Sequence, residues 1–289
     1  MTTTEEIVET AGRLTGRFRT PVNLAADAKG SIHDDATAQR LGFRGGTVAG
    51  SVHMQQFPPI LLRLFGERWF ETGNLSCYFR NATRGGEAVR PFAERPSGDL
   101  ATGQARLWSE KEDGTQVLEG TASLAGCPQP SEVERRLQNL PPRGETRILA
   151  QCEAGTVTGP FPVRIASGQQ ARQLASITEP LDWYTGPSPW GGPVVNPGLS
   201  LPLFRKAEEG FRLREHKSVG LFGAIEVRHL AGPMLVDRDY TCTGELLYVG
   251  DTPKSEYVWY RSTLHEGARD IASMTMMLRF MKASSDLWS

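Results

Sequence analysis

The sequence predicts an α+β fold made of two similar halves, each with a central helix followed by a run of antiparallel strands. The first observation behind this prediction is a weak internal repeat, because three short stretches recur in the same order about half of the 289-residue chain further on. The second observation is that both halves show the same succession of helix and strand signals. The paired stretches are residues 15–18 and 158–161, 44–48 and 190–194, and 81–86 and 229–233.

A central helix is expected in each half. In the first half, apolar side chains form a wide face over residues 50–65, and Pro58-Pro59 predicts a kink or a restarted helix within this segment. In the second half the helix is expected over residues 198–211, because Asn196 is a good cap and a proline follows it. Each helix offers an apolar surface around which a sheet can wrap.

Strands are expected after each helix, where aromatic and β-branched residues lie between Gly, Pro and Asp turns. A further strand is expected before each helix. The expected strands are residues 18–24, 75–81, 88–94, 101–109 and 116–124 in the first half, and 161–165, 221–230, 239–248, 255–264 and 271–280 in the second.

The repeat also predicts how the chain divides into domains. We expect an N-terminal domain over residues 1–127 that carries the candidate site, and a C-terminal domain over residues 148–289 with a degenerate site. Residues 128–147 are the expected linker. Within the linker, Ser131 and Glu134 form a capping-box pattern that predicts a short helix.

Composition narrows the possible functions. Hydrophobic residues make up 39% and charged residues 22%, which is typical of a globular protein with a substantial core. The net charge of -1 provides no field for nucleic acid or an anionic membrane, and no apolar run is long enough to span a bilayer. The four cysteines are scattered, without the spacing of a zinc site. We therefore expect a cytoplasmic protein with no metal or other cofactor and no nucleic-acid or membrane partner.

The stretch most informative about function contains a histidine at an expected helix start. Ser31 and the acids that follow it favour a helix over residues 36–41, and Gly42 favours its end. His33 is therefore expected near a helix N-terminus, and the backbone N–H groups around Gly50 near another. A titratable base and an oxyanion site together indicate a pocket that handles acyl groups.

This stretch resembles the MaoC-like dehydratases, the (R)-specific enoyl-thioester hydratases of the hotdog fold. The family signature runs Asp-x-Asn-Pro-x-His, then Asp and Ala, then Gly-Phe, then a hydrophobic-x-His-Gly step into the central helix. The match covers roughly residues 27–54. The residues that match in order are Ile32, His33, Asp35, Gly42, Phe43, Val48 and Gly50.

The resemblance implies a tandem, or double, hotdog with antiparallel sheets wrapped around central helices. It also implies a hydro-lyase that reversibly hydrates an enoyl thioester or dehydrates a 3-hydroxyacyl thioester. The partner would be an acyl-CoA or an acyl-carrier-protein thioester. The fused chain would be a monomeric pseudo-dimer or would form a homodimer.

The sequence departs from the family signature at three positions. Ala28 stands where the family keeps its catalytic Asp, Gly30 where it keeps the Asn, and Ala49 where it keeps the His before the glycine. Asp27 lies one residue before the family position, so a loop longer by one residue would restore an Asp–His pair with His33.

We therefore predict Asp27 and His33 as catalytic residues, and Gly50, Ser51 and His53 as substrate-binding residues. An imidazole titrates near neutrality and can pass a proton in either direction. A backbone N–H at Gly50 would stabilise the enolate-like charge that develops on a thioester carbonyl. Each residue also has a purely structural interpretation, which is a loop acid for Asp27, a turn for Gly50 and a buried polar group for His53.

Two alternatives compete with this assignment. Asp34 and Asp35 are other possible partners of His33, although Asp35 is expected to serve the helix start. A second functional hypothesis is a hotdog protein that only binds an acyl or other small ligand, or catalyses a different reaction with His33 alone. It would be favoured if Asp27 were exposed to solvent and no other carboxylate faced His33. A hotdog thioesterase is a weaker alternative, because residues 50–66 contain no carboxylate.

The second half lacks counterparts of the candidate catalytic residues of the first half. No histidine occurs between Phe161 and Trp190, where a counterpart of His33 is expected. The loop over residues 183–190 is rich in aromatic residues and proline instead, which favours a rigid packing element over a binding wall. The resemblance implies that this half shapes the acyl tunnel.

Overall fold

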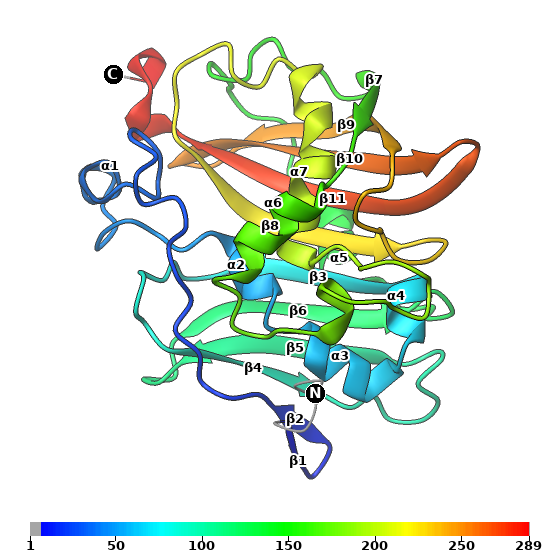
Figure 1. The fold of residues 1–289 in the computed structure, drawn as a ribbon. Coiled ribbons are helices and arrows are strands. Elements are labelled where there is room, and N and C mark those ends of the chain that lie inside the picture. The colour runs from blue at the N-terminus through cyan, green and yellow to red at the C-terminus, as the bar shows by residue number, and fades with distance from the viewer. Residues whose placement is uncertain (1–6, 289) are drawn as a thin grey trace.

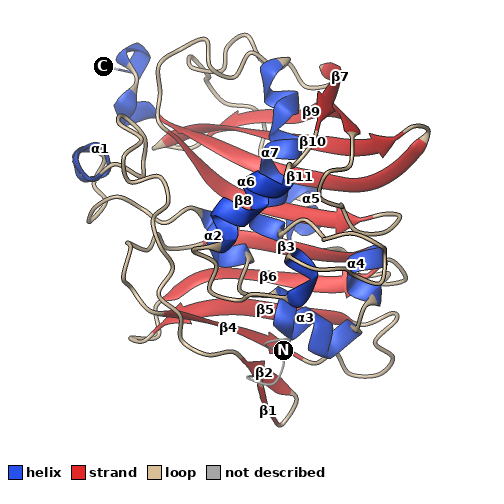
Figure 2. Cartoon of the chain, in the orientation of Figure 1, coloured by secondary structure: helices blue, strands red, loops and turns tan. Residues whose placement is uncertain are grey.

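The computed structural model describes residues 7–288. These residues form a single twisted sheet of 11 strands in which every neighbouring pair is antiparallel (Figures 1 and 2). In order across the sheet, the strands are β1 (Val8–Thr10), β2 (Arg13–Thr15), β4 (Val89–Glu94), β5 (Gln104–Lys111), β6 (Gln116–Leu124), β3 (Gly73–Phe79), β8 (Gly220–His229), β11 (Arg269–Met281), β10 (Ser255–Glu266), β9 (Tyr240–Asp251) and β7 (Val157–Val163).

The two halves of the chain have the same strand order. The first half runs β2-β4-β5-β6-β3, and the second runs β7-β9-β10-β11-β8, so the two orders are mirror images across the middle of the sheet. The halves meet where β3 pairs with β8, and Ser76 lies opposite Glu226 at the centre of that ladder. The repeat seen in the sequence therefore corresponds to two like units joined into one sheet.

The central helices pack on one face of this sheet (Figure 1). In the first half they are α2 (Gly50–Met54), α3 (Pro58–Phe65) and α4 (Arg68–Thr72). A restart at the proline pair is thus confirmed, since α3 begins at Pro58.

In the second half, α7 (Pro197–Arg205) is followed by a 3-10 turn, η3 (Lys206–Glu209), which ends slightly before the predicted end of the helix. The side chain of Asn196 caps α7 by accepting a hydrogen bond from Gly198 N at 2.9 Å, as predicted. The helices α2 and α7 approach closely, because a Cβ placed on Gly198 would lie only 2.1 Å from the side-chain nitrogen of Gln55.

The remaining helices lie outside this central layer. They are α1 (Asp35–Arg40), α5 (Glu132–Gln138), α6 (Ser167–Leu174), η2 (Asp182–Tyr184), η4 (Lys282–Ser284) and η5 (Asp286–Trp288). The capping box of Ser131 and Glu134 is present at the start of α5, which packs on the opposite face of the sheet, with Val133 N donating to Ser76 Oγ at 2.9 Å. No helix within residues 7–288 is long and apolar enough to cross a membrane.

Two local predictions were wrong, and one helix was not predicted. Residues 18–24 do not form a strand; the edge strand is β2, and only Arg19 continues its pairing through a single bridge to Val89. The N-cap of α1 is Asp34 rather than Ser31, whose hydroxyl instead accepts a hydrogen bond from the backbone N of His33. Helix α6 was not predicted, because its segment is strongly polar.

Candidate functional site

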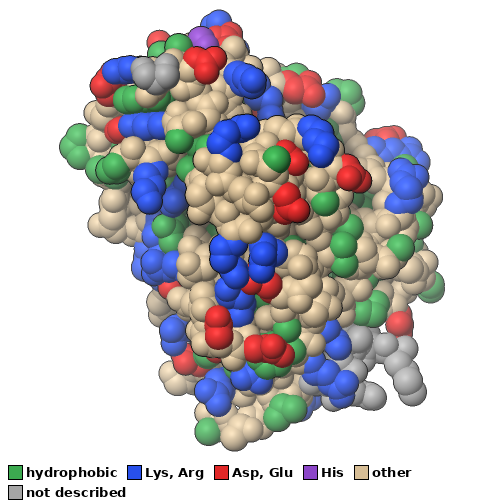
Figure 3. All heavy atoms as spheres, turned by 90° about the vertical axis from the view of Figure 1, so that its left-hand side faces the viewer, with side chains coloured by type: hydrophobic (Ala, Val, Ile, Leu, Met, Phe, Trp, Pro, Cys, Tyr) green, Lys and Arg blue, Asp and Glu red, His purple; other side chains and the backbone are tan. Residues whose placement is uncertain are grey.

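A cavity of about 1110 Å³ lies between the two halves and contains the predicted histidine loop. His33, Gly50 and His53 line it from the first half, together with the residues at the end of β3. The second half lines it with Arg205, residues 213–214 and 216–222, the turn 252–255 and the end of β11. These segments lie on the left-hand side of Figure 1, which Figure 3 turns toward the viewer.

The imidazole of His33 is held in one tautomer. Its Nδ1 lies 2.7 Å from the backbone carbonyl oxygen of Thr47. A carbonyl oxygen can only accept a hydrogen bond, so Nδ1 carries the proton and Nε2 keeps a free lone pair when the ring is neutral. The side chain is partly exposed and lines the cavity. Nε2 of His33 is thus the nitrogen available as a base to a bound ligand.

Close backbone contacts position the loop that carries His33. Asn23 Nδ2 donates to the His33 carbonyl at 2.8 Å, and Thr47 N donates to the Ile32 carbonyl at 3.0 Å. A Cβ on Gly46 would lie 2.1 Å from the His33 carbonyl oxygen, so any other residue at position 46 would push the histidine loop away. This close approach gives a physical reason for the glycine pair recognised in the sequence.

The acids next to His33 serve the loop and helix α1. Asp34 Oδ2 accepts hydrogen bonds from Thr37 Oγ1 at 2.6 Å and from Thr37 N at 3.3 Å, and the bond from the Thr37 hydroxyl holds the pKa of this carboxyl below its usual value. Asp35 Oδ1 accepts a hydrogen bond from Gly46 N at 2.6 Å. Neither acid lines the cavity.

Asp27 does not reach the site that His33 lines. Its side chain is exposed, and the residue is outside the cavity lining. Ser51 is also outside the lining, although it lies next to Gly50 in the first turn of α2. The structure therefore brings His33, Gly50 and His53 together, but leaves Asp27 and Ser51 outside.

Gly50 begins α2 beside the ring of Phe79. Its backbone N–H has no acceptor within residues 7–288, as expected for a first helical position. A Cβ at this position would lie 2.5 Å from the Phe79 ring. Gly50 therefore leaves room for the Phe79 ring, and its N–H remains unpaired within residues 7–288 in the wall of the cavity.

His53 is a second imidazole in the wall of the cavity. Its side chain is buried, and its Nε2 lies 2.7 Å from Thr83 Oγ1. Burial lowers the pKa of His53 to about 4, so the ring is neutral at physiological pH. Its Nδ1 is buried without a hydrogen-bond partner in the part of the chain that the structure describes.

The charge of the cavity wall was not predicted. Six Lys and Arg residues line it, while none of the described lining residues is Asp or Glu. Figure 3 shows Lys and Arg side chains gathered near the middle of the same side of the molecule. Most of these cations come from the second half, so only the folded arrangement places them near His33. They are Arg80, Arg205, Arg214, Lys217, Lys254 and Arg279.

The aromatic loop of the second half packs its rings against the first half. The rings of Trp183 and Trp190 meet edge to face with centroids 5.4 Å apart, and both contact Phe70 of α4 at 5.8 Å. His229 packs against Phe70, and burial lowers its pKa to about 4. The aromatic loop thus packs against α4, as its composition predicted, but Trp190 also lines a neighbouring cavity of about 500 Å³.

Comparison with known proteins identifies this fold. No family model and no curated protein match the sequence. Solved structures do match over nearly the whole chain. A structure described as a putative MaoC domain protein dehydratase from Chloroflexus aurantiacus has a TM-score of 0.65 and 14% identity, and the alignment covers 95% of this chain and 96% of that one.

Two further structures match over similar lengths. A MaoC-like dehydratase has a TM-score of 0.55 and 12% identity, covering 95% of this chain and 98% of that one. A conserved hypothetical protein of Mycobacterium tuberculosis, described as having a double hotdog fold, has a TM-score of 0.52 and 14% identity, covering 91% and 92%. This chain is a double hotdog. Its double hotdog fold is that of MaoC-like proteins, and the α+β prediction with wrapped central helices is confirmed.

Proposed function

We propose that this double hotdog binds an acyl thioester in the cavity between its halves, and that His33 is the single acid–base group acting on the bound acyl chain. The observation that carries the proposal is the 2.7 Å contact between His33 Nδ1 and the Thr47 carbonyl, which leaves Nε2 as a base within the cavity. The resemblance of residues 27–54 to the enoyl-thioester hydratases supports the choice of a thioester ligand, and structures described as MaoC-like dehydratases share the fold.

The reaction that suits one base is a syn hydration. His33 Nε2 would take a proton from water as the hydroxyl adds to the β-carbon of an enoyl thioester, and the charge would move to the thioester oxygen. The N–H of Gly50 would stabilise that oxygen, and the imidazolium would then return the proton to the α-carbon. Every proton is accounted for without a second acid or base.

This reaction scheme uses His33 without the carboxylate partner of an Asp–His pair. Since Asp27 is exposed and Asp34 and Asp35 are engaged in loop contacts, no carboxylate of the described chain lines the cavity. One acid–base partner is commonly worth about 10²–10⁴-fold in rate. We therefore expect hydration to be slow compared with that of a two-residue hydratase.

A second candidate function is ligand binding without turnover, and the same missing carboxylate favours it. The two candidates are separated by measuring binding and chemistry on one set of proteins. A saturated acyl-CoA would be titrated by calorimetry, and an enoyl-CoA would be followed by the loss of its conjugated absorbance. Binding and slow hydration that disappears in His33→Asn support the enzyme; binding without hydration supports the ligand-binding protein. Absence of acyl-thioester binding would refute both.

A further inference from the structure

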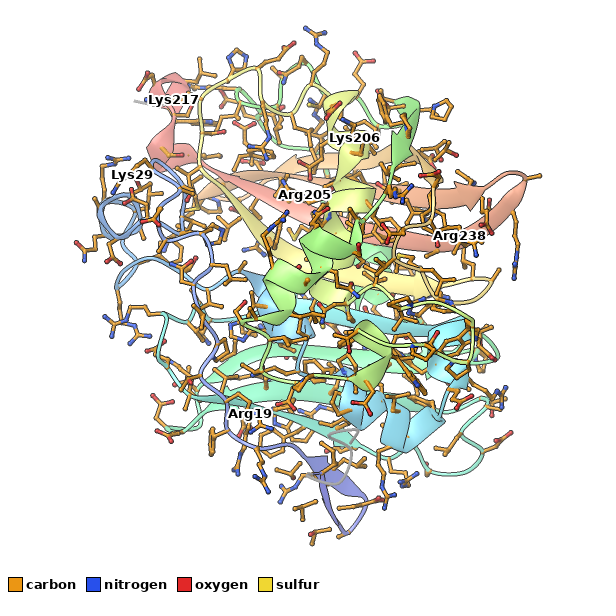
Figure 4. All side chains as sticks on the ribbon, in the orientation of Figure 1. Arg19, Lys29, Arg205, Lys206, Lys217 and Arg238 are labelled. Atoms are coloured by element: carbon orange, nitrogen blue, oxygen red, sulfur yellow. The ribbon has the colours of Figure 1, made fainter. Side chains whose placement is uncertain are left out.

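A second, smaller cavity lies on the opposite side of the molecule from the cavity described above. Its volume is about 500 Å³. The first half lines it with the end of α4, and the second half with Trp190, residues 231–233 and the hairpin that joins β10 to β11. Figure 4 shows Arg238, which lines this cavity, on the right, and Lys217, which lines the larger cavity, on the left. The two cavities are therefore separate sites.

The internal repeat relates the smaller cavity to the larger one. Asn81 N donates a hydrogen bond to the Val117 carbonyl at 3.2 Å, and Ala231 N donates to the Ile271 carbonyl at the same distance of 3.2 Å. The first pair of residues lines the larger cavity, and the second pair lines the smaller one. The smaller cavity is therefore the counterpart, in the second half, of the cavity that contains the histidine loop.

The chemistry of the smaller cavity differs from that of the larger one. Among its lining residues that the structure describes, none is a histidine and none belongs to α7, so the wall has neither a base nor a helix start. Two acidic and two basic side chains line it, and their formal charges cancel. They are Glu71, Arg238, Glu266 and Arg269. A wall with both signs of charge is complementary to a ligand that itself carries both.

One charge of each sign in this wall is left without a partner. Arg238 Nη1 lies 3.2 Å from Glu266 Oε1, so these two side chains neutralise each other. Glu71 and Arg269 are exposed, and neither forms an ion pair with a residue between 7 and 288. One carboxylate and one guanidinium in the wall are therefore available to a ligand.

The loop between β8 and β9 holds both of these residues. Gly232 N donates to the backbone carbonyl of Glu71 at 3.0 Å, and Arg269 Nη2 donates to the Ala231 carbonyl at 2.8 Å. The backbone of Glu71 and the guanidinium of Arg269 are thus anchored to adjacent residues of one loop. A small ligand whose opposite charges are a few bonds apart suits this arrangement.

Two aromatic residues complete the wall. Trp190 is partly buried and offers apolar ring surface to the cavity. Tyr240 is only 5% exposed, and its hydroxyl accepts a hydrogen bond from Leu235 N at 2.9 Å, while its own proton has no acceptor in the described part of the chain. Burial raises the pKa of Tyr240, so the hydroxyl keeps this proton. A buried donor of this kind suits a carboxylate oxygen.

We propose that the smaller cavity binds a free α-amino acid with an apolar side chain. The ammonium group pairs with Glu71, and the carboxylate binds Arg269 and the hydroxyl of Tyr240. The apolar side chain lies against Trp190. The volume of about 500 Å³ is within the roughly 300–1,000 Å³ usual for a small-molecule site. This site does not depend on the proposed function, which concerns the other cavity.

The proposal is tested with L-phenylalanine and three analogues that each lack one of its features. The wild-type protein would be titrated by calorimetry with L-phenylalanine, with 3-phenylpropionate, which lacks the ammonium, with phenethylamine, which lacks the carboxylate, and with glycine, which lacks the apolar side chain. L-Phenylalanine is expected to bind at least about 10-fold more tightly than each analogue. No binding of L-phenylalanine, or an equal affinity for any of the three analogues, would overturn the proposal.

Two variants assign the charges of the ligand to their partners. Glu71→Gln is expected to weaken L-phenylalanine binding on the order of 10-fold and to leave 3-phenylpropionate binding unchanged. Arg269→Gln is expected to weaken L-phenylalanine binding to a similar extent and to leave phenethylamine binding unchanged. The ligand that is unaffected in each variant also shows that the variant is folded. An equal loss for the single-charge ligand would contradict the assignment.

The controls are exposed residues outside this cavity. Glu67 lies one turn before Glu71, and Arg261 is on β10; neither lines the cavity. Glu67→Gln and Arg261→Gln should bind L-phenylalanine as the wild type does, and a loss equal to that of the site variants would show a diffuse surface effect instead of a site. His33→Asn should also leave this affinity unchanged, because His33 lines the other cavity. Loss of L-phenylalanine binding in His33→Asn would put the ligand in the larger cavity and overturn the proposal.

Discussion

His33 Nδ1 lies 2.7 Å from the carbonyl oxygen of Thr47, so the partner that orients the imidazole is a backbone carbonyl and not a carboxylate. A carbonyl fixes the tautomer, but it stabilises the imidazolium less than a negatively charged carboxylate does. The histidine is therefore oriented as a base without a charged group behind it. This one contact leads to the first prediction.

Replacing His33 with Asn should remove acyl chemistry while leaving the fold intact. The side chain is on the cavity wall and partly exposed, so its loss is expected to change the free energy of unfolding by less than about 1 kcal/mol. The hydration rate should fall at least about 100-fold, since the base of the proposed reaction is gone. Parallel measurements of enoyl absorbance and urea unfolding check both expectations; an unchanged rate would remove His33 from the mechanism.

Asp27→Asn should have no effect on that rate. The residue is exposed and does not line the cavity, so its carboxylate has no contact with a ligand bound beside His33. We expect the rate of enoyl hydration to stay within about twofold of wild type, because surface changes away from a site are nearly neutral. A loss comparable to that of His33→Asn would show that Asp27 acts together with His33 and would contradict the one-base scheme.

Gly46→Ala should displace the histidine loop. The new Cβ would lie 2.1 Å from the His33 carbonyl oxygen, which forces a backbone shift and is expected to cost about 1–3 kcal/mol of stability. Gly192→Ala is the matched control from the repeated glycine pair of the second half, because a Cβ there meets no atom within 4 Å. Thermal unfolding of the two variants should differ clearly; equal stability would show that the loop relaxes freely.

The two buried histidines should make the protein less stable as the pH is lowered. Burial lowers the pKa of His53 and of His229 to about 4, whereas an unfolded histidine titrates near 6.5. Unfolding therefore takes up protons between about pH 6.5 and 4, and the free energy of unfolding decreases as pH is lowered through this window. Each histidine contributes at most about 1.4 kcal/mol per pH unit.

The measurement is urea unfolding across that pH window for the wild type and for His229→Gln. The variant removes His229, the one of the two histidines that lies outside the cavity, so its stability should change less steeply with pH than that of the wild type. An identical slope would mean that His229 is not neutral and buried in solution.

The architecture was largely predictable because it depends on local patterns. Alternating apolar residues and turn signals placed all the long strands within a few residues of their observed bounds, and the proline pair marked where α3 begins. The predicted strand over residues 18–24 was wrong because the apolar side chains of Val22 and Leu24 stay exposed, at 49% and 52%, in a loop that passes the His33 segment. A short apolar run does not show whether the edge of a sheet lies close enough in the fold to pair with it.

The site was predictable only in part. His33 and Gly50 come from one contiguous motif, so sequence reasoning found them and the structure brings them to one cavity. Lys217 and Lys254 are far from that motif in the sequence, and they line the same cavity only because the two halves join into one sheet. The role of Asp27 rested on the length of one loop, which sequence spacing does not determine.

The pairing of β3 with β8 through Ser76 and Glu226 has an evolutionary consequence. In an assembly of two identical chains, each substitution appears twice, so a base cannot be discarded from one site and retained in the other. Fusion into one polypeptide removes that constraint. One half can then keep its histidine while the other replaces the equivalent loop with tryptophans, and natural selection can act on the two lobes independently.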